Sequence, residues 1–73
     1  MAKTNSLTKD QILREFETMK SFELSAHDLY TKIAADPGVG PEKFRTAFAS
    51  LAADEKRHAD LVQEIISIVG NAL

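Results

Sequence analysis

Helix-breaking residues occur almost entirely in one short segment of this 73-residue chain. It has three glycines and two prolines, and all of them except Gly70 lie in the segment 36–41, Asp-Pro-Gly-Val-Gly-Pro. Proline disfavours helical geometry in the residue before it, and glycine is entropically costly within a helix. The sequence therefore predicts an all-α protein with a single domain, residues 1–73, in which two long helices form an antiparallel hairpin.

The ends of both helices carry capping signals. Thr8, followed three residues later by Gln11, fits a capping box, and Ser6 is an alternative cap, so the first helix is expected over residues 8–35. Pro41 suits the first position of a helix, and Gly70 suits the residue after its last turn. The second helix is therefore expected over residues 41–69, with 36–41 as the turn.

Apolar residues recur at heptad spacing along both predicted helices. The stripes pass through positions 12, 16, 19, 23, 26, 30 and 33 in the first helix and 44, 48, 51, 55, 58, 62, 65 and 69 in the second. Further apolar residues, among them Ala52 and Ala59, flank both stripes, which makes them wider than one facing helix covers. We therefore expect two hairpins to pair into a four-helix bundle, as a homodimer or a higher homo-oligomer.

Composition excludes several classes of protein. Nine Lys and Arg against eleven Asp and Glu give a net charge of −2, and no basic run is present, which argues against nucleic-acid binding. The absence of cysteine excludes disulfides and thiolate metal sites. No long apolar run predicts a transmembrane helix, and the polar residues 1–10 do not resemble a signal peptide. We expect a soluble cytoplasmic protein with no membrane partner.

Three positions in the apolar stripes carry ionisable side chains: Glu23, Glu55 and His58. Because the turn is centred near residues 38 and 39, folding the hairpin places Glu23 level with Glu55, and His58 lies one turn further along the same face. Pairing two hairpins would gather four carboxylates and two imidazoles. Two divalent cations would balance the negative charge of the carboxylates. This ligand set suits iron, manganese or zinc. The alternative is a hydrogen-bonded polar layer that fixes the register of the helices.

Two sequence patterns resemble a known family. The segment 54–58, Asp-Glu-Lys-Arg-His, has the D-E-x-R-H form of ferritin-like di-iron carboxylate proteins. Glu23, followed seven residues later by Tyr30, is similar to the first helix of rubrerythrins and short encapsulated ferritins. The resemblance covers about residues 15–69. It implies Glu23 as a terminal ligand, Glu55 as a bridging ligand and His58 as an imidazole ligand of two irons per dimer.

The resemblance also implies an activity, and this chain departs from the family in its number of helices. Ferritins and rubrerythrins carry four helices in one chain, whereas this chain carries two, so it looks like a half-sized, encapsulated-ferritin type with a site between chains. The implied function is a ferroxidase that oxidises Fe(II) to Fe(III) for iron storage or detoxification. A surrounding protein shell, or nanocompartment, is a candidate partner. Alternatives are a rubrerythrin-like peroxide reductase, a non-catalytic module stapled by metal, and a metal-free helical interaction domain.

Several neighbouring residues have two interpretations. By the resemblance, Asp54 would hydrogen-bond a ligating imidazole of the partner helix; alternatively, it faces solvent and pairs with Arg57 or Lys56. Tyr30 would either hydrogen-bond a ligand carboxylate or simply pack in the stripe. His27 follows Glu23 by four residues, so the two could reach a common ion; because His27 lies off the stripe, it is instead expected to be a surface or interface histidine. The glycine-rich segment lacks the residues of a phosphate loop and is expected to be a plain turn.

Overall fold

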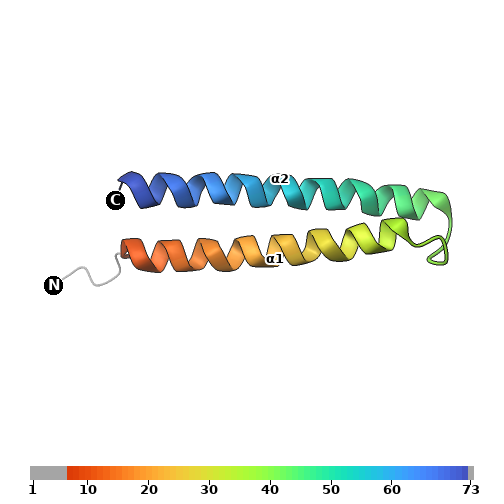
Figure 1. Cartoon of the computed structure of the whole chain (residues 1–73), viewed down its shortest axis with the longest axis horizontal. Coiled ribbons are helices and arrows are strands. Elements are labelled where there is room, and N and C mark those ends of the chain that lie inside the picture. The colour runs from red at the N-terminus through yellow and green to blue at the C-terminus, as the bar shows by residue number, and fades with distance from the viewer. Residues whose placement is uncertain (1–6, 73) are drawn as a thin grey trace.

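The computed structural model describes residues 7–72 and shows two antiparallel helices joined by a short turn (Figure 1). α1 spans Lys9–Ala35 and α2 spans Glu42–Ala72. The start of α1 and the end of α2 lie at the same end of the hairpin, opposite the turn. These residues contain no strand, so the predicted all-α hairpin is confirmed.

The capping box at the start of α1 forms as the sequence predicts. The Thr8 hydroxyl accepts a hydrogen bond from the Gln11 backbone N–H at 3.1 Å, and the Gln11 side-chain oxygen accepts one from the Thr8 N–H at 2.8 Å. These two contacts satisfy backbone donors that have no partner within the helix. Thr8 is therefore the N-cap, and the alternative, Ser6, lies outside the described residues.

The turn uses the special residues of the segment 36–41. Asp36 ends α1 in an extended conformation, and its side-chain Oδ1 accepts a hydrogen bond from the Gly38 N–H at 2.9 Å. Gly40 has a φ of +151°, a conformation that residues with a Cβ rarely adopt. The chain then enters α2 at Glu42, one residue after the predicted start.

The end of α2 differs from the sequence prediction. The helix continues through Gly70 to Ala72 instead of stopping at residue 69. Gly70 does not have the positive φ that is typical of a C-terminal cap. Among the described glycines, only Gly40, in the turn, has a positive φ. A single helical glycine costs only about 1 kcal/mol relative to alanine, which is too little to end a helix of this length.

Packing between the helices corrects the predicted position of the stripe on α2. The buried residues of the described range are Ala52, Ala59 and Val62, and the two alanines flank the predicted stripe instead of lying in it. Leu51, Ile65 and Phe44, which the prediction placed in the stripe, are 42%, 38% and 51% exposed. The physical reason is that the stripe is two adjacent heptad seams: one faces α1, and the other faces away from it.

The outward seam gives the hairpin an apolar face. On each helix, the outward seam is reached from the packed seam by the same rotation about the helix axis, taken along the chain. Because the two helices run in opposite directions, these rotations have opposite senses in space, and the outward residues of both helices lie on the same side of the hairpin. Large apolar residues that are exposed on this side define the face: Met19, Phe22 and Leu29 from α1, and Phe44, Leu51, Leu61, Ile65 and Ile68 from α2. The opposite side of the hairpin carries mainly polar residues, such as Lys56, Arg57 and Asp60. Neither α1 nor α2 is long and apolar enough to cross a membrane.

Candidate metal centre

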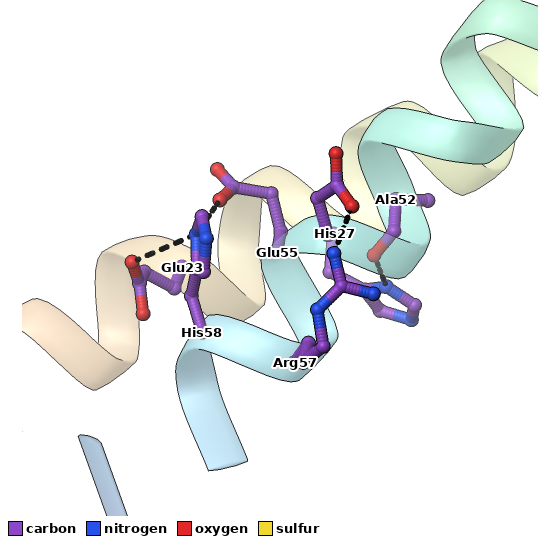
Figure 2. Close-up of polar contacts among 7 residues, drawn as sticks. Glu23, His27, Ala52, Glu55, Arg57 and His58 are labelled. Carbon is purple, nitrogen blue, oxygen red and sulfur yellow. Dashed lines mark hydrogen bonds and ion pairs between the residues drawn. The ribbon is translucent and has the colours of Figure 1, made fainter. Parts of the chain in front are cut away.

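Glu23, Glu55 and His58 come together at the middle of the hairpin. His58 Nδ1 lies 3.2 Å from Glu55 Oε1, three residues earlier on α2, and 3.7 Å from Glu23 Oε1 on α1. Figure 2 shows the imidazole with both carboxylates beside it. The structure therefore places Glu23 level with Glu55, as expected from the position of the turn.

The two carboxylates are mostly shielded from water, whereas the histidine is open. The side chains of Glu23 and Glu55 are 21% and 23% exposed, and that of His58 is 52% exposed. His58 belongs to the outward seam, which places it in the middle of the apolar face. The cluster thus begins between the helices and opens onto the apolar face.

One carboxylate oxygen of this cluster has no partner. Glu23 Oε2 is buried and makes no hydrogen bond to any described residue. A buried polar atom without a partner costs about 1–3 kcal/mol, and more when it is charged. Such atoms are rare in folded proteins and call for an explanation, of which a bound ion is one.

Small residues allow the helices to meet closely at this level. Ala52 is 6% exposed and Ala59 is 3% exposed, and these two residues flank Glu55 on the seam that faces α1. Because alanine projects only a methyl group, α1 can approach until the Glu23 side chain reaches Glu55 and His58. A larger residue at either position would push the carboxylates apart.

The three side chains have the chemistry and spacing of a cation site. Each offers one ligand atom, and these atoms lie within 4.8 Å of one another. Ligand oxygens and imidazole nitrogens bind transition metals at about 2.0–2.2 Å, so atoms on one ion are at most about 4.4 Å apart. Side-chain movements of a few tenths of an ångström would therefore suffice. Two carboxylates and one imidazole suit iron, manganese or zinc, and three ligands leave coordination positions open.

Asp54 and Tyr30, the two residues expected to support the ligands, make other contacts within the single chain. Asp54 forms an ion pair with Arg57, which is one of the two interpretations left open by the sequence. The Tyr30 ring packs on Phe48, with the ring centres 5.8 Å apart and the planes at 45°. Its hydroxyl makes no hydrogen bond within residues 7–72. Within residues 7–72, neither side chain makes a hydrogen bond or ion pair with the three-residue cluster, so their support of the ligands stays a prediction.

Two contacts near the cluster were missed by the sequence analysis. His27 is half-buried, and its Nδ1 lies 2.9 Å from the backbone oxygen of Ala52. Lys20 Nζ donates to Gln63 Oε1 at 2.7 Å. The sequence could have indicated the His27 contact. His27 lies one helical turn from Glu23 in the direction of the hairpin turn, and Ala52 lies one helical turn from Glu55 in the same direction. The stripe predicted for the first helix passes beside His27, whereas the structure places its ring against the backbone of α2.

The chain matches none of the protein-family models, curated proteins or solved structures with which it was compared. The site is therefore defined by its own geometry: a two-helix hairpin with a Glu-Glu-His cluster between its helices, open on an apolar face.

Proposed function

We propose that two copies of the hairpin pair through the apolar face and hold two divalent metal ions with Glu23, Glu55 and His58 of each copy. The observation that carries this proposal is the buried Glu23 Oε2 without a partner. A cation held by Glu55 Oε1, His58 Nδ1 and both oxygens of the Glu23 carboxylate would satisfy Oε2 and neutralise the two clustered carboxylates.

The apolar face supports the pairing. Its large side chains are between 38% and 70% exposed, and they run along α2 from Phe44 to Ile68. Large apolar side chains exposed on one side of a protein are typical of protein–protein interfaces. Because His58 lies within the face, pairing would bring the two clusters of a dimer together at its centre.

Charge explains why such a dimer needs metal. Removing an ionised carboxylate from water costs several kcal/mol unless it is paired. A dimer closed over the site would gather four carboxylates, and two divalent cations balance their charge. Metal and pairing would therefore stabilise each other.

The chemistry that fits this ligand set best is oxidation of Fe(II), which enters the site as the substrate. Carboxylate oxygens are hard, anionic ligands and favour Fe(III) over Fe(II). Two Fe(II) ions lose one electron each, and dioxygen takes up both electrons with two protons to give hydrogen peroxide. The similarity of residues 54–58 to ferritin-like proteins supports the same reaction. We therefore propose a half-sized, ferritin-like ferroxidase that acts in iron storage or detoxification.

Oxygen uptake after addition of Fe(II) tests this activity. Glu23→Gln keeps the size of the side chain and removes its charge, so we expect the rate to fall by at least tenfold. The matched control is Glu17→Gln on the same helix, whose side chain is 56% exposed. The control should retain the rate of the unsubstituted protein. Equal rates for both variants, at the level of iron in buffer alone, would contradict the proposed function.

A second candidate function is a metal staple without catalysis. Only Ala52, Ala59 and Val62 are buried among residues 7–72, which is a very small core for a stable hairpin. A structural metal is one way in which small domains gain the missing stability. In this case Zn(II) or Fe(II) would raise the melting temperature, while oxygen uptake would stay at the level of free iron.

A further inference from the structure

Two hydrogen bonds connect α1 to α2 within the part of the chain that the structure describes. One joins the His27 ring to the Ala52 backbone oxygen, on the turn side of the Glu-Glu-His cluster, at 2.9 Å (Figure 2). The other joins Lys20 Nζ to Gln63 Oε1, on the open side of the hairpin, at 2.7 Å. The cluster therefore lies between two cross-links of very different stiffness.

The chemistry of the first contact fixes which ring nitrogen carries a proton. A backbone carbonyl oxygen can only accept, so His27 Nδ1 must be the donor. The Ala52 oxygen also belongs to the hydrogen-bond ladder of α2, as every carbonyl in the interior of a helix does. His27 therefore holds the backbone of the other helix and not a mobile side chain.

The position of His27 links this contact to the ligands. His27 follows Glu23 by four residues and so lies one turn away on the same face of α1. Ala52 precedes Glu55 by three residues on α2. The imidazole is a rigid ring with two rotatable side-chain bonds. In contrast, Lys20 and Gln63 are both long and flexible, and their contact is exposed.

Near the Glu-Glu-His cluster, packing alone only weakly defines how far one helix is shifted along its axis relative to the other. The buried residues on either side of Glu55 are the small Ala52 and Ala59, which present low ridges to α1. A shift by one residue along a helix moves a side chain by about 1.5 Å. Metal ligands must be held within about 0.5 Å of their productive geometry, so even this shift would separate Glu23 from Glu55 and His58.

We infer that His27 is a positioning residue: its Nδ1–H donates to the Ala52 carbonyl and so holds Glu23 level with Glu55 and His58. The role in metal binding rests on the function proposed above. The role in helix register does not, because the contact joins two groups of the chain itself and uses none of the three proposed ligands.

The first test measures register without metal. In NMR spectra of the isotopically labelled protein with a chelator, we expect a cross-peak between side-chain protons of Glu23 and His58, which lie close in the structure. His27→Leu removes the donor but keeps an apolar side chain of similar size, and it should remove this cross-peak while circular dichroism shows unchanged helix content. His27→Asn places an amide N–H near the position of Nδ1 and should restore the cross-peak. Gln63→Ala, which breaks the flexible cross-link, should leave it intact.

The second test measures the consequence for metal, with Co(II) as a coloured probe. We expect His27→Leu to bind Co(II) at least tenfold more weakly and with an altered visible spectrum, His27→Asn to recover both properties, and Gln63→Ala to stay within twofold. If His27→Leu changed neither the cross-peak nor the Co(II) affinity, the inference would be overturned. If the unsubstituted protein bound no Co(II) but its cross-peak depended on His27, the proposed metal function would fail and the positioning role would stand.

Discussion

Glu23 on α1 and His58 on α2 lie 3.7 Å apart, measured from Oε1 to Nδ1, at a level of the hairpin where the buried residues of α2 include the small Ala52 and Ala59. Glu23 is largely shielded, whereas half of His58 remains exposed on the apolar face. This pair therefore connects the interior of the hairpin to the surface through which we propose that it dimerises.

Removing the charge of Glu55 should abolish stabilisation by metal. In the proposed site Glu55 neutralises the cations, so Glu55→Gln should lower the affinity for Zn(II) by at least tenfold and remove the rise in melting temperature on metal addition. Glu64→Gln is the matched control, because Glu64 is exposed on the same helix. Thermal melts with Zn(II) and with chelator measure both variants. Equal metal-induced shifts would mean that Glu55 is not a ligand.

A charge in the apolar face should prevent pairing. Leu51 is 42% exposed on this face, and burying a glutamate there costs several kcal/mol. Leu51→Glu should therefore be monomeric in the presence of metal, whereas Ser50→Glu, one residue away on the polar side, should still form dimers. Analytical ultracentrifugation distinguishes the two. If Leu51→Glu still formed dimers with metal, the apolar face would not be the interface.

Two glycines should respond in opposite ways to alanine. Gly40 has a φ of +151°, a backbone conformation that is strained for a residue with a Cβ, so Gly40→Ala should destabilise the protein by about 1–3 kcal/mol. Gly70 lies within α2 with nothing within 4 Å of an added Cβ, so Gly70→Ala should stabilise it by about 0.5–1 kcal/mol. Chemical denaturation measures both values. A stabilising Gly40→Ala would show that the turn has a different backbone conformation.

The capping box should contribute measurably to stability. Thr8→Ala removes the hydroxyl that accepts from the Gln11 N–H, and the loss of such a cap costs about 1 kcal/mol, or roughly 4–8 °C in melting temperature. Thr18→Ala is the control, because the Thr18 hydroxyl only donates to the Arg14 carbonyl within α1. This control should be neutral or slightly stabilising, since alanine favours helix more than threonine does. A destabilisation of Thr18→Ala equal to that of Thr8→Ala would contradict a specific cap.

The elements that sequence predicts well here are those with local causes. The Thr8 cap, the segment 36–41 and the two helices depend on residues close together in the chain, and all three are found in the structure. The level of Glu23 with Glu55 also follows, because it depends only on helix geometry and the position of the turn. The family resemblance and the identity of any metal stay predictions.

The packed seam could not be read correctly from periodicity, for a physical reason. Apolar residues form two adjacent seams on α2, and both repeat every seven residues, so the pattern does not say which seam faces α1. The structure places the small Ala52 and Ala59 inside, where the helices approach closely, and the larger Leu51 and Ile65 outside. The His27 contact was missed for the same reason, because it depends on which seam is buried.

Native mass spectrometry of the metal-loaded protein tests the central claim most directly, because one spectrum reports the number of chains and the number of metal ions in the same particle. The protein after incubation with Zn(II), as a redox-inert substitute for Fe(II), should appear as dimers, or as assemblies built from them, with two metal ions per pair of chains. A Glu23→Gln/Glu55→Gln double variant should carry none. Metal-free dimers alone, or monomers with no bound metal at saturating Zn(II), would contradict a site shared between two hairpins.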